Sequence, residues 1–250
     1  MIFTNLIQTN LQTSFIGRNI EYFSFTDSTN DDAFDLILNE DPKDGTLIIT
    51  DHQRKGRGRR EKKWVSTPGN NLTFSLILNK KVQCSDELFS IMSGIAVIKG
   101  ISKFTGIECA MKWPNDIILN NKKIGGILIE TKRNNPYLVI GIGLNVNEQE
   151  MPDNLINIAT SLRIEKESSI QREPLLAFIL NEFENLYNEK SEKWLSDWKK
   201  YCNHINKKVE FNNNHELISG YFLDIDNHGN AIIDVNSEKI KIGSGTIKIL

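Results

Sequence analysis

The chain has few of the residues that build disulfide frameworks, metal centres or membrane spans. Its three cysteines, Cys84, Cys109 and Cys202, are scattered and form no CxxC pair. This argues against a disulfide scaffold or a structural zinc and fits a reducing compartment. The four histidines show no HExxH-like spacing. The sequence has no run of eighteen apolar residues and no signal-peptide pattern at its start, so we expect a cytoplasmic protein without a membrane span.

An excess of charge of either sign is also missing, because 30 lysines and arginines face 32 aspartates and glutamates. The local exception is HQRKGRGRREKKW at residues 52–64, where seven of the ten residues from Arg54 to Lys63 are cationic. A basic stretch on a slightly acidic chain has a local anionic ligand as its first explanation.

This basic loop (residues 52–64) has the composition of an anion clamp. Gly56 and Gly58 allow the backbone to approach a ligand closely. Arg57 and Arg59 alternate with them, so that both guanidinium groups can point the same way in an extended segment and grip phosphate or carboxylate oxygens. The pattern is neither a dinucleotide fingerprint nor a P-loop. The alternative is a solvated loop that binds nucleic acid without specificity.

Periodicity and turn residues predict a mixture of helices and strands. Helices are expected over 29–40, 86–104 and 172–201, strands over 45–50 and 71–78, and several crowded strands over 108–147. From about residue 205, short strands joined by Asn-rich turns predict a small all-β module. The length suits one large domain plus such a module.

Three further stretches could contribute to a site. In KWPND, Asn115 and Asp116 could seat a hard cation such as Mg²⁺, although a structural turn with surface lysines explains the pattern as well. Gly141 and Gly143 lie in a predicted strand, where a ligand or another backbone, or else a bulge, would account for them. Ser28 in DSTN is typical of a helix N-cap, and the same small polar side chains suit a carbonyl or ureido group.

In this order and spacing, the stretches resemble the biotin protein ligases, which adenylate biotin and attach it to a lysine of a carrier domain. The combination of GRGRR with KWPND is one that we know from no other family. The motifs that carry the resemblance are DSTN at 27–30, QxxGRGRRxxxW at 53–64, SxPGxNLxxSL at 66–76, KWPND at 112–116, IGIGLNVN at 140–147 and ATSLR at 159–163.

The resemblance implies an α+β fold, with a central mixed β-sheet and flanking helices of the class II synthetase-like kind. It implies a catalytic domain over 1–204 and an SH3-like β module over 205–250. Some members of the family carry an N-terminal helix-turn-helix domain, and this chain is expected to lack it and to have no repressor role.

The resemblance also assigns roles to particular residues. Lys123 and Arg57 would be catalytic. Biotin would be bound by Ser28, Thr29, Asn30, Gln53, Gly56, Arg57, Gly58, Arg59, Lys123, Gly126, Gly141 and Gly143. ATP would be bound by Arg57, Arg59, Arg60, Trp64, Asn115 and Asn145, with Mg²⁺ at Asp116. Two residues depart from the family pattern, Lys55 and Glu61, and both lie in the basic loop.

The expected partners are therefore biotin, ATP with Mg²⁺, and a biotin carboxyl carrier domain, with a homodimer possible and no nucleic acid or membrane. One alternative is an enzyme of the lipoate or octanoate ligase type, which shares the fold. A second is a nucleic-acid-binding protein that uses the basic loop, and a third is a non-catalytic biotin-binding relative. The second leaves KWPND and IGIGLNVN unexplained, and the set of Arg57, Arg59 and Lys123 argues against the third.

Overall fold

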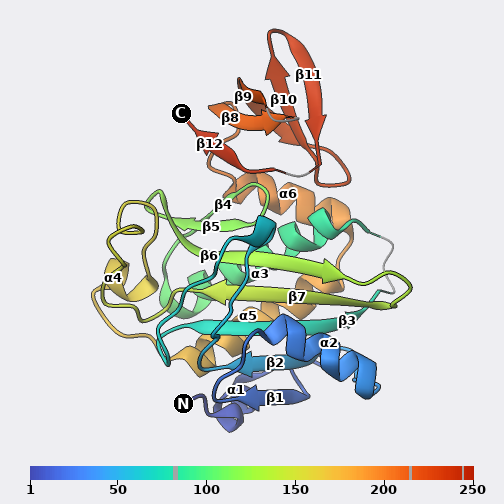
Figure 1. The fold of residues 1–250 in the computed structure, drawn as a ribbon, viewed down its shortest axis with the longest axis vertical. Helices are drawn as coiled ribbons and strands as arrows, with labels where there is room; N and C mark the ends of the chain where they lie inside the picture. Colours follow the sequence, from blue (N-terminus) through green and yellow to red (C-terminus); the bar gives the residue numbers. More distant parts are fainter. Residues whose placement is uncertain (81–83, 214–215, 244) are drawn as a thin grey trace.

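The fold consists of a large sheet with helices on both faces and a smaller sheet at the C-terminal end (Figure 1). The computed structural model describes residues 1–80, 84–213, 216–243 and 245–250. Within them, the large sheet has the order β1-β2-β3-β7-β6-β5-β4. Its strands are β1 (Ile20–Phe23), β2 (Thr46–Thr50), β3 (Leu72–Asn79), β4 (Ala110–Lys112), β5 (Asp116–Leu119), β6 (Lys122–Thr131) and β7 (Tyr137–Leu144). β1 and β2 are parallel and the other pairs antiparallel, which confirms the expected α+β class with a mixed sheet.

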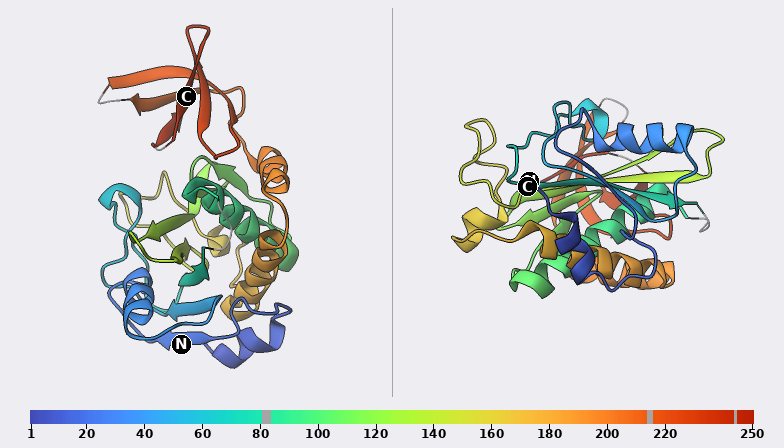
Figure 2. Two further views of the ribbon diagram at one scale, coloured as in Figure 1. Left: turned by 90° about the vertical axis from the view of Figure 1, so that its right-hand side faces the viewer. Right: turned by 90° about the horizontal axis from the view of Figure 1, so that it is seen from below.

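Helices cover both faces of this sheet (Figure 2). On one face lies α2 (Thr29–Asn39), whose Ala33 and Phe34 pack against Ile48, Ile77 and Val139. The opposite face carries α1 (Thr4–Asn10), α3 (Asp86–Thr105), α5 (Arg172–Tyr187) and α6 (Ser191–Tyr201). The short helix α4 spans Leu162–Lys166. With both faces covered, β3 is buried over seven consecutive residues, so Thr73 and Ser75, which alternate with its apolar side chains, are buried as well.

The central helix α3 is defined by caps that the sequence carries. The Ser85 hydroxyl accepts from the Leu88 N–H, and Gly106 ends the helix with a φ of 76°, a conformation that glycine adopts without strain. Of the described residues, α3 is the helix long and apolar enough to cross a membrane by length and composition, and 72% of its apolar stretch is buried within the protein. Its apolar side chains therefore belong to the core between the sheet and α5.

The continuous helix expected over 172–201 is wrong. α5 ends at Tyr187 and α6 begins at Ser191. The chain folds back at this break, so that the Trp194 indole N–H donates to the Leu186 carbonyl at 2.8 Å. A buried tryptophan that completes the last turn of the preceding helix is a tertiary contact, and helical periodicity carries no sign of it.

The C-terminal sheet has the order β11-β10-β9-β8-β12 and is antiparallel throughout. Its strands are β8 (Lys208–Asn213), β9 (Glu216–Ile225), β10 (Ala231–Val235), β11 (Glu238–Ile242) and β12 (Ile247–Ile249). This all-β region was expected from the sequence. The division into domains at residues 204 and 205 stays a prediction.

The two sheets meet at an aromatic joint. The Trp113 indole donates to the Gly229 carbonyl at 2.9 Å. Phe222 of β9 lies with its ring centroid 6.4 Å from Trp113, 6.0 Å from Trp198 and 4.5 Å from His204. His204 is fully buried in this joint, and burial, with the nearby charges of lysines, lowers its pKa to about 3.

His204 should make the joint sensitive to acid. Between pH 6.5 and 3 the unfolded chain binds a proton at this residue and the folded chain does not. The free energy of unfolding should therefore fall by about 1 kcal/mol for each unit by which the pH is lowered in this range. His204→Phe should remove this component, which is measured as the wild-type minus variant difference in urea unfolding between pH 7 and pH 4. The exposed His228, replaced by Asn, is the control and should follow the wild type. A constant difference for His204→Phe would contradict the assignment.

Candidate active site

A cavity of about 980 Å³ opens between the basic loop, strands β5 to β7 and the C-terminal sheet. All the site residues predicted from sequence line it except Gly56 and Arg60. Those that line it are Ser28, Thr29, Asn30, Gln53, Arg57, Gly58, Arg59, Trp64, Asn115, Asp116, Lys123, Gly126, Gly141, Gly143 and Asn145. Segments more than a hundred residues apart in sequence therefore line the same cavity.

The floor of the cavity is a buried network of polar side chains. The Thr29 N–H and hydroxyl donate to the Gln53 carboxamide oxygen at 2.8 and 3.0 Å. The Ser75 hydroxyl lies 2.7 Å from Thr29 Oγ1 and 2.6 Å from Asn30 Oδ1, and the Asn30 amide donates to Glu130 at 2.6 Å. These contacts fix the side chains before a ligand arrives, which lowers the entropy cost of binding.

Ser28 plays a different part from the one that its sequence suggests. It occupies the N-cap position of α2, but its hydroxyl makes no capping hydrogen bond. The side chain is buried and lines the cavity instead. The residue is therefore part of the cavity lining, although the residue type alone predicts a cap.

The glycines of β7 make room for side chains of the protein itself. A Cβ on Gly141 would lie 2.4 Å from Asn30 Oδ1, and one on Gly143 would lie 2.5 Å from the Trp64 ring. Asn30 and Trp64 thus lie against these glycines, which also line the cavity, and the expectation of a ligand along this strand stays a prediction. Glycine is required here because the floor and the end of the basic loop both rest on the strand.

The basic loop forms a narrow, hairpin-like turn. The Trp64 N–H donates to the Gly56 carbonyl at 2.9 Å, and the Gly58 N–H donates to the Lys62 carbonyl at 2.6 Å. A 3₁₀ turn over Arg59–Glu61, with Arg60 at a φ of 54°, interrupts the extended backbone. The Glu61 side chain lies outside the described part of the structure.

Arg57 and Arg59 flank the extended Gly58 and both line the cavity, and the 3₁₀ turn begins only at Arg59. Arg57 forms a two-pronged ion pair with Asp31 at 2.5 and 2.6 Å and lies 3.5 Å from Glu130. Hydrogen bonding to Asp31 is the main reason that the pKa of Arg57 is raised. Sequence reasoning missed both carboxylates, since neither belongs to a motif with the loop.

The KWPND turn places a lysine and a carboxylate against each other. Lys123 Nζ lies 2.5 Å from Asp116 Oδ1, and the Asn115 amide donates to the Ile127 carbonyl at 2.7 Å. Asn145, beyond the end of β7, donates to the Thr160 carbonyl at 3.0 Å. The turn is therefore structural in its hydrogen bonds, while Lys123 and Asp116 both face the cavity.

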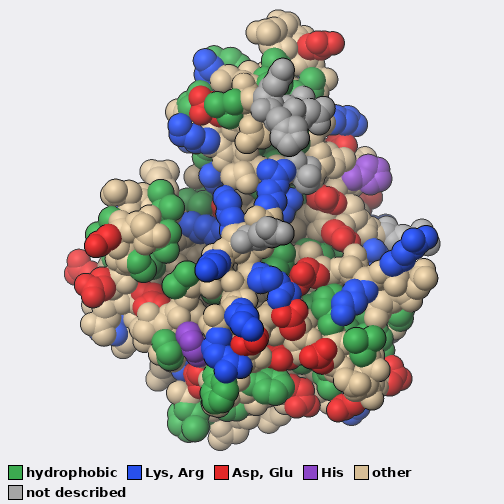
Figure 3. All heavy atoms as spheres, in the orientation of Figure 1, with side chains coloured by type: hydrophobic (Ala, Val, Ile, Leu, Met, Phe, Trp, Pro, Cys, Tyr) green, Lys and Arg blue, Asp and Glu red, His purple; other side chains and the backbone are tan. Residues whose placement is uncertain are grey.

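Positive charge dominates the cavity wall, and Figure 3 shows a band of lysines and arginines up the middle of this face. Among the described residues, Asp116 is the acidic side chain that lines the cavity, and the basic ones are Arg57, Arg59, Lys62, Lys63, Lys112, Lys123, Lys207 and Lys248. Burial lowers the pKa of Arg59 and of Lys112, and neither forms an ion pair with any described residue. Buried charges of this kind are costly without a counter-ion, so the cavity is suited to an anionic ligand.

The C-terminal sheet contributes to this wall in a way that sequence reasoning missed. Lys207, Thr246, Lys248 and Ile249 line the cavity, whereas all predicted site residues lie before residue 150. Lys207, just before β8, and Lys248 on β12 follow no motif, and their place depends on how the two sheets are packed together.

These features define the class of the protein. Residues 22–147 match the model of the biotin/lipoate A/B protein ligase family, and the chain belongs to this family. Among its relatives are biotin ligases. It is 34% identical to the bifunctional ligase/repressor BirA of Bacillus subtilis, over 97% of this chain and 78% of the relative. It is 27% identical to the biotin–[acetyl-CoA-carboxylase] ligase of Mycobacterium tuberculosis, over 92% and 88%.

The solved structures agree with this assignment. The biotin protein ligase of Aquifex aeolicus, determined in complex with biotin and ATP, superposes with a TM-score of 0.82 at 26% identity, over 93% of this chain and 99% of that one. The resemblance read from the motifs is thereby confirmed.

The close contact at β7 gives a prediction about stability. In Gly141→Ala the new methyl group would meet Asn30, which Ser75 and Glu130 hold in place, so the free energy of unfolding should fall by about 1–3 kcal/mol. Gly58→Ala is the matched control, because the nearest atom to its new Cβ lies 3.4 Å away, and it should change stability by less than about 0.5 kcal/mol. Both values are measured by urea denaturation. Equal losses in the two variants would mean that Asn30 does not hold its position over the strand.

Proposed function

We propose that this chain is an ATP-dependent biotin protein ligase, which joins biotin to AMP and then transfers biotin to a lysine of a carrier domain. The observation that carries the proposal is the cavity itself, with a prearranged polar floor and a wall on which the described residues place eight cations and one carboxylate. The family and its relatives support the same activity. The carrier, a carboxylase domain, is part of the proposal.

The positive wall suits the chemistry of the first step. The biotin carboxylate has to attack the α-phosphorus of ATP, and two like charges about 4 Å apart repel by roughly 4 kcal/mol at an effective dielectric constant of 20. Fixed cations offset this repulsion and stabilise the charge that develops on the phosphoryl oxygens. We assign this role to Lys123 and Arg57, with Arg59 as a further cation that forms no ion pair with any described residue.

The biotin ring system would lie on the floor of the cavity. Ser28, Thr29, Asn30 and Gln53 present hydroxyl and amide groups there, which match the ureido group of biotin in hydrogen-bonding type. Gly126, Gly141 and Gly143 would form the walls of a narrow slot. The carboxylate end would then point toward Lys123 and the basic loop, where the nucleotide phosphate has to meet it.

Nucleotide binding would involve Arg59, Arg60, Trp64, Asn115 and Asn145. Asp116 fits a Mg²⁺ site, because this ion is held in such enzymes by one or two carboxylates together with substrate phosphates. Among the described residues no group of three or more His, Cys, Asp or Glu could enclose a metal, so the triphosphate would supply the other ligands. When bound, the ion neutralises charge on the phosphates. The Lys123 ammonium group would then give up its ion pair with Asp116 and contact the biotin carboxylate and the α-phosphate.

In the second step the carrier lysine amine attacks the acyl carbon and AMP departs. The product of the first step is a mixed anhydride that water destroys, and the basic loop would cover it and exclude water. No residue of the chain needs to act as a covalent nucleophile. We also propose a cytoplasmic location and a homodimer, which the reducing composition and the family resemblance favour.

The direct test is transfer of biotin to a biotin carboxyl carrier domain in the presence of ATP and Mg²⁺, followed by mass spectrometry of the intact carrier. The expected result is a single biotinyl adduct on one lysine, dependent on ATP. Parallel reactions with lipoate and octanoate test the alternative substrate class. An adduct with lipoate and none with biotin would overturn the proposal.

Lys123→Ala should reduce the rate of biotin-dependent pyrophosphate release by about 10²-fold or more, since it removes a preorganised cation at the reacting oxygens. The affinity for biotin alone, measured by calorimetry, should change much less. Lys122→Ala is the matched control, because the neighbouring amine donates to the Ile156 carbonyl and does not line the cavity. Pyrophosphate release at the wild-type rate in Lys123→Ala would refute the assignment.

Arg59→Gly should let the adenylate escape. The loss of a half-buried cation from the cover over the intermediate should raise biotinylation of a bystander protein about tenfold or more. The readout is blotting with a lysine-rich protein present. Arg54→Gly removes a loop cation that pairs with Asp27 outside the cavity and should stay faithful to the carrier. If both variants label the bystander equally, retention does not depend on Arg59.

A further inference from the structure

The basic loop is held very differently at its ends and along its span. The chain leaves β2 at Thr50 and enters β3 at Leu72, and the basic loop lies within this connection. We call Asp51 the near foot of the connection, residues 67–71 its far foot, and the residues between them its span. The cavity residues Arg57, Arg59 and Trp64 lie on the span between them.

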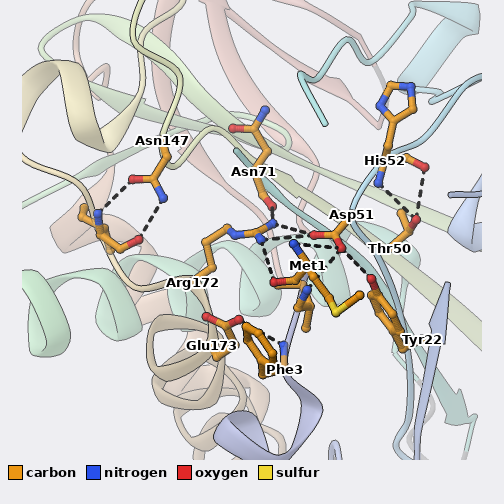
Figure 4. A network of polar contacts seen from close by, with 12 residues as sticks. Met1, Phe3, Tyr22, Thr50, Asp51, His52, Asn71, Asn147, Arg172 and Glu173 are labelled. Atoms are coloured by element: carbon orange, nitrogen blue, oxygen red, sulfur yellow. Dashed lines mark hydrogen bonds and ion pairs between the residues drawn. The ribbon is translucent and has the colours of Figure 1, made fainter. Parts of the chain in front are cut away.

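Arg172 of α5 joins the two feet (Figure 4). Its guanidinium donates to Asp51 Oδ1 and to the Asn71 carbonyl, each at 3.1 Å, and its exposed fraction is 7%. The Tyr22 hydroxyl donates to the other oxygen of Asp51 at 2.6 Å. Although burial alone would raise the pKa of Asp51, these partners lower it overall, so the near foot carries a carboxylate charge bound on both sides.

Glu148, just beyond β7, holds the far foot. Its carboxylate accepts from the Thr67 N–H at 2.8 Å, the Asn70 amide at 3.2 Å and the Asn71 amide at 2.6 Å, and it is 9% exposed. The Ser161 hydroxyl donates to its backbone carbonyl at 2.7 Å. A carboxylate with three donors in a buried setting forms strong hydrogen bonds.

The charged side chains of the span, in contrast, form exposed ion pairs, while its backbone is held at Arg54 and Lys55, whose N–H groups donate to the Thr26 and Asp27 carbonyls. Asp27 pairs with Arg54 at 2.9 Å and with Lys55 at 2.8 Å, and Arg57 pairs with Asp31. All of these side chains are well exposed, and exposed ion pairs contribute little. The charged side chains of the span can therefore exchange their partners while both feet stay in place.

We propose that Glu148 and Arg172 are positioning residues of the ligase reaction, which fix the two feet so that the span closes over the adenylate in one register. This rests on the proposed function. Glu148 follows Asn145 by three residues, and Asp51 precedes Gln53 by two. The residues that anchor the loop thus belong to the same segments that line the cavity, and an error at either foot would displace Arg59 at the reacting groups.

The test compares Glu148→Gln with Glu184→Gln. Glu184 is a matched control, since it is 7% exposed and accepts from the Ser14, Phe15 and Ile16 N–H groups of another segment. Both variants should lose similar thermal stability. Only Glu148→Gln should release the adenylate about tenfold faster, because misplacement by an ångström has effects of this order, while biotin affinity stays within about twofold. Arg172→Lys, which keeps the charge but not the fork, should release it faster as well.

A second readout is independent of activity. Trypsin should cut between residues 54 and 63 about tenfold faster in Glu148→Gln than in the wild type or in Glu184→Gln. Asn70→Asp, which sets a second carboxylate against Glu148, weakens the same foot and replaces Glu148→Gln if that variant does not fold. If the wild type makes no adenylate, the proposed function fails and the cleavage rates still decide the role of Glu148. Equal release and equal cleavage in the Glu148 and Glu184 variants would overturn the inference.

Discussion

The repulsion among cations around one cavity is the constraint on which the rest of the site depends. Arg59 and Lys112 are half-buried beside other positive side chains, and such charges are costly without a counter-ion. The folded chain tolerates them because Asp31, Glu130 and Asp116 neutralise part of the set. An anionic substrate completes that neutralisation, and the same charges that weaken the empty protein strengthen the loaded one.

This constraint explains why the site is assembled from separate segments. Cations on one strand or helix would repel each other within a single rigid element, whereas here they come from the basic loop, the β5–β6 hairpin and the C-terminal sheet. Each segment has its own buried anchor, such as the packing of Trp113 and Phe222 at the joint between the sheets. Packing energy from the core thus holds like charges close together.

The fold class and most of the cavity residues could be predicted from the sequence. GRGRR, KWPND and the glycines of β7 are local patterns, and the residue types in each of them indicate a chemical role. The sequence could not indicate the partners that tertiary packing supplies. Asp31 and Glu130 around Arg57, Asn30 across Gly141, and Lys207 and Lys248 from the second sheet follow no spacing rule. The break between α5 and α6 was missed for the same reason, since it depends on Trp194 reaching back to a carbonyl.

The pairing of Arg57 with Asp31 has a consequence for the order of events. Asp31 is about half exposed, so its hold on the guanidinium is weak in water, and a substrate carboxylate or phosphate in a drier cavity binds the same group more strongly. The pair therefore keeps Arg57 near the cavity without competing with the ligand. The proposed closure would then exchange Asp31 for a substrate carboxylate or phosphate at Arg57, with the buried feet of the loop unmoved.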